Sequence, residues 1–295
     1  MRVRMVTSMA AIAIGLPALL FSVLADDLGL GATPARNAAD TPISDAARGT
    51  AVAARGPSAA AAPVVPDPAP LLLHAAPVRI STSGFWSWAL LDIRNGVITG
   101  SPTLRRPSDT ASMIKAWLAA DQLRRATAPP SKAKLHAISV MLRDSDNDVA
   151  EDLYESAGGS AAIKRLFAVC GLTDSKAGRG WSVTMLSARD AARMGACIAD
   201  GRAAGPTWTP WLLNEMRQVR GAGRYGVIEA FPPALARSMA IKNGWLLRAD
   251  GQWHVNCLAV GDGWVLSVMQ RYPGRLGVGH GWAVCKSIAQ QLMVH

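Results

Sequence analysis

The residues with the clearest chemical potential stand in three short stretches of the chain. In the first, Ser112 precedes Lys115 by three positions at the start of a segment with helical periodicity. Residues three apart share one helix face, so the lysine is predicted to lie beside the serine hydroxyl. A serine needs a base to become a nucleophile, and a buried lysine that loses its proton can supply one. The pair predicts nucleophilic chemistry, the alternative being a solvated lysine beside an N-terminal serine. Ser131 and Lys134 repeat the spacing in a more polar setting.

The second stretch is Ser145-Asp146-Asn147, which lies between two segments of helical periodicity. Its simplest interpretation is a helix N-cap, because these residue types are favoured there. The functional interpretation makes Ser145 a proton shuttle, Asn147 a contact to substrate and lysine, and Asp146 an internal brace.

The third stretch, Lys242-Asn243-Gly244, lies within a predicted strand. A glycine inside a strand is disfavoured unless something approaches the backbone closely, which indicates the edge of a site. The alternative is an exposed lysine before a bulge. Trp245 follows directly, and we expect it and Trp181 to form aromatic walls of a cleft.

Turn signals and periodicity predict the elements that position these stretches. Strands are expected at 84–93 and 97–100, around Asn95-Gly96, and at 240–247, 253–260 and 264–272. Helical periodicity covers 110–125, 134–142, 148–156, 160–169, 187–199, 210–219 and 279–294. This order predicts an α+β fold with a five-stranded antiparallel sheet, a flanking terminal helix and an inserted helical lobe. A cleft between lobes is a common place for a ligand site.

The N-terminal segment is predicted to precede the folded domain. Residues 1–25 have two arginines and an apolar run ending in Val23-Leu24-Ala25, which is typical of a secretory signal peptide. An uncleaved membrane anchor is the alternative. Residues 26–78 are dominated by Ala and Pro and are predicted to be a disordered linker, with a short docking helix near 69–76. The folded domain is placed at 79–295, and the protein is expected to be secreted or to reside in the cell envelope.

Four cysteines in an exported chain allow two disulfides and three connectivities. Cys170 and Cys197 fall on neighbouring predicted helices, whereas Cys257 falls on a strand and Cys285 on the last helix. We therefore predict the pairs Cys170–Cys197 and Cys257–Cys285. The spacing does not fit a zinc site.

The formal net charge of +10 raises the question of an anionic partner. Nucleic acid is not expected, because no nucleic-acid-binding motif accompanies the charge. In an exported protein, anionic wall polymers or a membrane surface are the expected partners, and a solvated arginine-rich surface is the alternative. We expect a monomer.

With S-x-x-K, S-D-N and a variant of K-T-G in this order, residues 84–292 resemble the superfamily of class A β-lactamases and penicillin-binding D,D-peptidases. Two helices add to the resemblance, through Leu153, Tyr154 and Gly158-Gly159 after S-D-N, and through Trp211-Leu212-Leu213 and Met216-Arg217 before the third motif. The resemblance implies a β-lactamase-like fold and a serine hydrolase domain.

The resemblance also implies a role for each motif residue. Ser112 would be acylated, with Lys115 as base and Ser145 as proton shuttle. Substrate contacts would come from Asn147, Lys242, Asn243, Gly244 and Trp245. The backbone N–H groups of Ser112 and Trp245 would form the oxyanion hole. No metal and no cofactor is implied.

Two departures limit what the resemblance implies about turnover. Class A enzymes release the acyl group with a loop glutamate, but residues 171–185 contain Asp174 and no glutamate. Asn243 replaces the hydroxyl residue of K-T-G, and His254 either assists anion recognition or is a buried structural residue. We therefore predict acylation by a β-lactam or D-Ala-type peptide with slow deacylation. The alternative is an inactive β-lactamase-like protein that binds peptidoglycan or an envelope partner.

Overall fold

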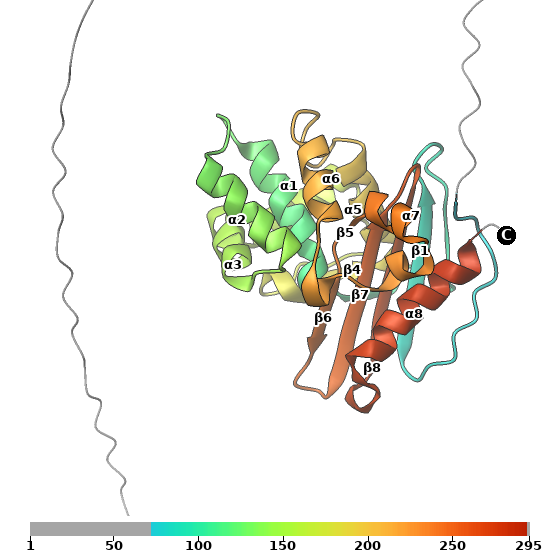
Figure 1. The fold of residues 1–295 in the computed structure, drawn as a ribbon. Helices are drawn as coiled ribbons and strands as arrows, with labels where there is room; N and C mark the ends of the chain where they lie inside the picture. Colours follow the sequence, from blue (N-terminus) through green and yellow to red (C-terminus); the bar gives the residue numbers. More distant parts are fainter. Residues whose placement is uncertain (1–71, 294–295) are drawn as a thin grey trace, which may run out of the picture. The chain divides into compact units, whose positions relative to one another are not determined.

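The computed structural model describes residues 72–293 (Figure 1). The predicted signal peptide, the linker up to residue 71 and the beginning of the predicted docking helix lie outside the described residues.

The described end of the predicted linker already packs on the domain. Leu73 is fully buried and forms an isolated antiparallel bridge with Met293. The His74 N–H donates to the Leu292 carbonyl at 2.9 Å. Residues 72–78 contain no helix, so the docking segment is extended where it is described. The packed chain therefore begins before the predicted start at Arg79, because Leu73 finds an apolar site beside the last helix.

The predicted antiparallel sheet is present and is built from the two ends of the domain. Its strands are β1 (Phe85–Asp92), β2 (Ile98–Gly100), β5 (Ala240–Ile241), β6 (Gly244–Leu247), β7 (Gln252–Val260) and β8 (Trp264–Pro273). The order is β2-β1-β8-β7-β5, and β6 also pairs with β7. β5 and β6 both pair with the same edge of β7, one after the other. They correspond to one predicted strand, which is interrupted at Lys242-Asn243. Five strand positions therefore form the sheet, as predicted.

The helical lobe lies between β2 and β5 in sequence, as predicted. The α-helices are α1 (Lys115–Arg125), α2 (Lys132–Arg143), α3 (Asn147–Ser156), α4 (Ser160–Cys170), α5 (Ala188–Ala199), α6 (Thr209–Arg217), α7 (Pro233–Ser238) and α8 (Gly277–Leu292). Short 3₁₀ turns include η1 (Ala111–Ile114), η2 (Trp181–Val183), η3 (Gly221–Gly223), η4 (Gly226–Ala230) and η5 (Gly274–Leu276). A two-stranded sheet of β3 (Pro107–Asp109) and β4 (Met185–Ser187) was not predicted, because three residues are too short to show alternation.

Two apolar cores lie on the two faces of the main sheet. On one face α8 packs against β7 and η4, and on the other α5 packs against β1 and β8 (Figure 1). α1 runs through the lobe core, with Ala116 to Ala120 all buried. A helix that is buried on all sides needs apolar residues all round, which the sequence of α1 supplies in its first half. This rigid setting holds the residues at the N-terminal end of α1.

Both predicted disulfides are present. Cys170–Cys197 joins α4 to α5, with Cα atoms 5.4 Å apart. Cys257–Cys285 joins β7 to α8, with Cα atoms 6.4 Å apart. Within residues 72–293, no helix is both long and apolar enough to cross a membrane.

Candidate active site

A cavity of about 550 Å³ opens where the helical lobe meets the edge of the sheet. η1, the start of α3, η2 and β6 contribute to its walls. The lining residues are Ala111, Ser112, Asp144, Ser145, Asn147, Asp148, Glu151, Trp181, Ser182, Trp245 and Leu246. Residues of the first two sequence motifs, together with Trp245 directly after the third, therefore meet at one cavity.

Two residues beside this cavity have a backbone conformation that side chains disfavour. Ala111, directly before Ser112, has φ +44°, and Ser145 has φ +63°. A non-glycine residue in this region costs about 1–3 kcal/mol, and such strain clusters at functional sites. The surrounding packing thus fixes both serines at some cost to the backbone.

Gly244 brings the sheet edge against the start of α1. A Cβ on Gly244 would lie 2.4 Å from the Thr110 carbonyl oxygen and 2.7 Å from the backbone nitrogen of Ser112. Such distances leave no room for a side chain, because the nearest atoms belong to backbone. The close approach expected for a glycine inside this strand is therefore present.

The backbone N–H of Trp245 points away from the sheet. In the β6–β7 ladder the Arg248 N–H donates to the Gln252 carbonyl at 2.9 Å. Hydrogen-bonded positions alternate along an antiparallel strand, so Leu246 and Gly244 also face β7. Trp245 then directs its N–H to the edge of β6 opposite β7, and its side chain lines the cavity.

Lys115 lies fully buried below the cavity floor. Its Nζ donates to the Ser145 carbonyl at 2.6 Å and to Asn147 Oδ1 at 2.7 Å. Burial lowers the pKa of Lys115 to about 8, and the nearby Asp146 carboxylate opposes this shift only in part. The Trp181 ring centroid lies 4.8 Å from Nζ. Lys115 therefore loses its proton more readily near neutral pH than an exposed lysine does.

Lys242 is a second fully buried lysine. Its Nζ donates to Ser145 Oγ at 3.0 Å, and Lys115 Nζ donates to the same oxygen at 3.4 Å. Burial and then the neighbouring Lys115 lower the pKa of Lys242 well below its usual value. Ser145 Oγ thus bridges two amines, which is the position a proton shuttle needs.

The N-cap interpretation of the Ser145-Asp146-Asn147 stretch is confirmed at Asp146, and the expected contact between Asn147 and a lysine is present. Asp146 is the N-cap of α3, with Oδ1 accepting from the Val149 N–H at 2.8 Å. The cap fixes the first turn of α3, and the flanking Ser145 and Asn147 contact Lys115. The capping residue therefore positions its two neighbours.

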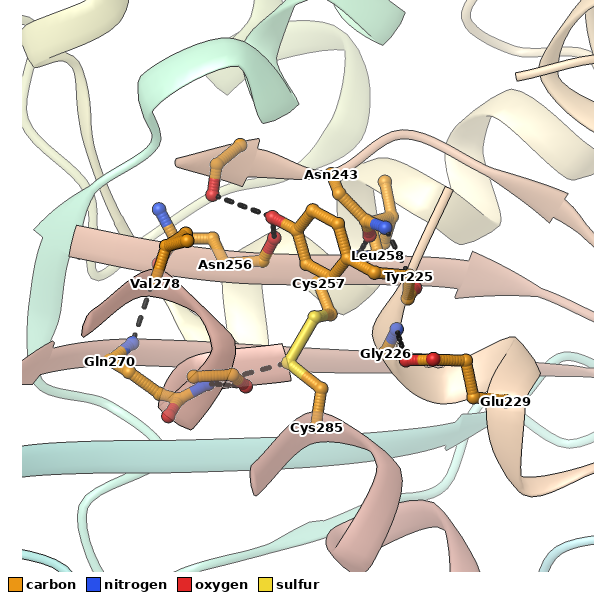
Figure 2. The surroundings of a disulfide bond; sticks show 12 residues. Tyr225, Gly226, Glu229, Asn243, Asn256, Cys257, Leu258, Gln270, Val278 and Cys285 are labelled. Carbon is orange, nitrogen blue, oxygen red and sulfur yellow. Dashed lines mark hydrogen bonds between the residues drawn. A yellow bond between two sulfur atoms is a disulfide. The ribbon is translucent and has the colours of Figure 1, made fainter. Parts of the chain in front are cut away.

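Asn243 does not lie where the sequence led us to expect it. Its Nδ2 donates to the Gly223 carbonyl at 3.0 Å and to the Tyr225 carbonyl at 2.9 Å. Its Oδ1 accepts from the Leu258 N–H at 3.3 Å (Figure 2). This placement contradicts the expected contact of Asn243 with substrate. The side-chain amide is buried, and it makes its hydrogen bonds to three backbone groups inside the protein.

Beneath the site, buried side chains continue this hydrogen-bond network. Tyr225 Oη donates to the Gly244 carbonyl at 3.2 Å and to the Asn256 carbonyl at 3.4 Å (Figure 2). Asn256 Nδ2 donates to the Asp109 carbonyl at 2.8 Å, just before η1. The network connects β6, β7 and the chain that leads to Ser112.

Replacing Asn243 by Ala is expected to lower the free energy of unfolding by about 2–3 kcal/mol. The change leaves up to three buried backbone groups without a partner, and each such group costs about 1–3 kcal/mol. Urea unfolding monitored by circular dichroism measures the difference. Asn214→Ala, at an exposed position of α6, serves as control and is expected to change little. An unchanged midpoint in Asn243→Ala would contradict this role.

Two other candidates from the sequence are held away from the cavity. Asp174 pairs with Arg105 at 3.2 Å and Arg189 at 2.7 Å. His254 is buried, with Nδ1 2.9 Å from Asp109 Oδ1. Asp174 therefore offers no carboxylate to the site, and His254 has the structural placement that was one of the two expectations.

Glu151 lines the cavity and was missed in the sequence analysis. It follows Asn147 by four positions on α3, so that the two side chains share a helix face. This spacing is visible in the sequence, but the family resemblance implies a glutamate on the loop after α4 and not on α3.

Comparison with known proteins supports the fold assignment. No family model matches the sequence. "Putative lipoprotein LppW" from Mycobacterium bovis and from Mycobacterium tuberculosis is 29% identical over 165 residues, covering 52% of this chain and 52% of each relative. The chain thus matches these curated relatives over about half their length.

Solved structures of class A β-lactamases superpose on the domain. TLA-3 extended-spectrum β-lactamase gives a TM-score of 0.58 at 15% identity, covering 71% of this chain and 93% of the other. A β-lactamase from Burkholderia vietnamiensis gives 0.57 at 18% identity, covering 71% and 90%. The chain has the β-lactamase fold. Ancestral (GNCA) class A β-lactamase agrees, with a TM-score of 0.55 at 17% identity over 71% and 94% of the two chains. Identities this low show the fold alone.

Proposed function

We propose that this protein is a serine hydrolase of the β-lactamase/D,D-peptidase type, which forms an acyl-enzyme on Ser112 with a β-lactam or a D-Ala-type peptide. The observation that carries the proposal is the buried Lys115, whose pKa is lowered to about 8 and whose Nζ contacts Ser145 and Asn147 below the cavity that Ser112 lines. A buried lysine with a lowered pKa can give up its proton and act as a base.

In the proposed acylation, neutral Lys115 takes the hydroxyl proton of Ser112 as Oγ attacks the substrate carbonyl carbon. The N–H groups of Ser112 and Trp245 stabilise the negative oxygen that forms, a contribution of ~3–4 kcal/mol for one such donor. The bond from the carbonyl carbon to the leaving nitrogen then breaks. Ser145 passes a proton from the neighbouring lysine amines to that nitrogen. Lys242, whose pKa is lowered by burial, is the second amine in contact with Ser145 Oγ in this relay.

The cellular setting is part of the proposal. Two buried disulfides are typical of proteins that fold outside the cytoplasm. The matched curated relatives carry the name lipoprotein. We infer an extracytoplasmic enzyme that acts on β-lactams or on peptides of the cell wall.

Intact-mass spectrometry after incubation with a penicillin, and separately with a fluorophosphonate, tests the proposal. The wild type is expected to gain one adduct, and Ser112→Ala is expected to gain none, because the variant lacks the attacking oxygen. Ser131→Ala, at the second S-x-x-K match, is the control, since Ser131 caps α2 by accepting from the Lys134 N–H at 3.2 Å. A wild type that gains no adduct from either reagent would favour the non-catalytic binding protein instead.

A further inference from the structure

Release of an acyl group from Ser112 needs a base, and the cavity holds carboxylates that the acylation step does not use. Asp144, Asp148 and Glu151 all line it. Asp144 forms two hydrogen bonds with Arg220, at 2.6 and 2.7 Å. Asp148 lies in the first turn of α3, where the helix dipole stabilises its negative charge. Glu151 lies one turn further along α3, at an exposed position.

The Trp181 side chain fixes the Glu151 carboxylate. Trp181 Nε1 donates to Glu151 Oε2 at 2.7 Å. The indole is buried, and its ring centroid lies 4.8 Å from Lys115 Nζ. The ring therefore spans from the acylation base to the carboxylate. Because the hydrogen bond occupies Oε2, Glu151 Oε1 remains available as an acceptor for a water molecule.

The geometry of α3 brings Glu151 close to the motif residues. Asn147 and Glu151 are four positions apart, so that they lie on the same helix face. Asn147 Oδ1 accepts from Lys115 Nζ at 2.7 Å. Glu151 thus sits one helical turn from a residue that contacts the acylation base, on the wall of the cavity that Ser112 also lines.

We propose that Glu151 is the base that activates water to release the acyl group from Ser112, an inference that rests on the proposed function. Glu151 takes a proton from water, and the water oxygen attacks the ester carbonyl carbon. The bond from that carbon to Ser112 Oγ then breaks. Oγ leaves with the electron pair and receives the proton, which regenerates the serine and yields a free carboxylic acid. Water is the only co-reactant.

Two features of the site fit this step. The cavity of about 550 Å³ holds an acyl group together with water, which takes roughly 30 Å³ per molecule. The loop between α4 and β4 supplies no competing carboxylate, because Arg105 and Arg189 hold Asp174. The base for release of the acyl group is therefore assigned to α3 and not to this loop.

The test separates release of the acyl group from its formation. Wild type, Glu151→Gln and Asp152→Asn are each pulsed with a penicillin, freed of excess reagent and followed by intact mass. Gln keeps the size of Glu and an oxygen for the Trp181 N–H but cannot take a proton. We expect Glu151→Gln to acylate at the wild-type rate and to lose its adduct at least about 100-fold more slowly, the usual contribution of a general base.

Asp152→Asn is the matched control, because it removes the same charge from an exposed position of the same helix that does not line the cavity. It is expected to lose its adduct at the wild-type rate. Adduct decay in Glu151→Gln at the wild-type rate would overturn the assignment, as would equal slowing in Asp152→Asn. A wild type that turns over without accumulating adduct, while Glu151→Gln accumulates it, would support the assignment. Failure of all three proteins to form an adduct would instead overturn the proposed function.

A second variant tests the role of Trp181 as the positioning residue. Trp181→Phe keeps a ring beside Lys115 but removes the Nε1 donor. We expect adduct decay to slow less than in Glu151→Gln, and the double variant to be no slower than Glu151→Gln alone, because both changes act on one step. Additive slowing in the double variant would contradict the coupling of Trp181 to Glu151.

Discussion

Lys115→Met is expected to lower the rate of acylation by about 10³-fold and, at the same time, to stabilise the fold at neutral pH. The loss of rate follows from loss of the base, whose contribution typically reaches 10²–10⁴-fold. The gain in stability follows from the buried amine, whose pKa falls from 10.5 to about 8 on folding. That shift corresponds to about 3 kcal/mol. Hydrogen bonds lost to Ser145 and Asn147 offset part of it, leaving a gain of about 1–2 kcal/mol.

The lowered pKa of Lys115 sets the direction in which stability and acylation rate change with pH. The folded-state pKa lies below the unfolded value, so between pH 8 and 10.5 the unfolded state binds more protons. Wild-type stability from this group therefore rises with pH through that window, and the advantage of Lys115→Met shrinks over the same range. The wild-type acylation rate should rise with pH up to about 8, because only neutral Lys115 accepts a proton.

Urea unfolding at pH 7 and pH 10, with acylation rates from intact mass, checks both effects. Lys134→Met, in the second S-x-x-K match, is the control and is expected to leave acylation unchanged. A Lys115→Met variant that acylates at the wild-type rate would refute the role of Lys115. Strong destabilisation at pH 7 would show that Lys115 is a structural cation.

Gly244→Ala is expected to reduce acylation by about 100-fold while the protein still folds. The new Cβ would lie 2.4 Å from the Thr110 carbonyl oxygen and 2.7 Å from the Ser112 nitrogen, so β6 and η1 must separate. A displacement of about 1 Å at a reacting centre typically costs 10²-fold. The added atom also overpacks the site, at a cost of about 1–3 kcal/mol.

Gly279→Ala is the matched control, because a Cβ at Gly279 on α8 meets nothing within 4 Å. We expect it to leave acylation unchanged and to stabilise α8 by up to ~1 kcal/mol. Acylation rates and thermal unfolding of the two variants provide the comparison. Equal acylation rates in both would show that contact between β6 and η1 does not control the site.

Much of the fold could be predicted because each element has a local signal. The Asn95-Gly96 turn predicted the first hairpin, and Gly96 has φ +73°. The disulfide pairs followed from the elements on which the cysteines fall. β3 and β4 had no such signal, since they are three residues long and exist only through pairing with each other.

For the candidate site, too, the sequence predicts only those features that have a local signal. Ser112 and Lys115 lie three positions apart where η1 leads into α1, and this local spacing is visible in the sequence. The direction of the Asn243 side chain depends on Gly223 and Tyr225, which lie far from it in sequence. Local pattern cannot specify such a tertiary contact, and the amide was therefore wrongly assigned to the substrate side.

The most direct measurement for the whole account is localisation of the adduct by fragmentation of the peptide that contains Ser112. That peptide also holds Ser108, which is fully buried and provides an internal control. The account predicts that, after a brief exposure to a penicillin, the added mass lies on Ser112 and on no other residue. Acylation at any other residue, or a Ser112 peptide that stays unmodified in both wild type and Glu151→Gln when circular dichroism shows both to be folded, would contradict it.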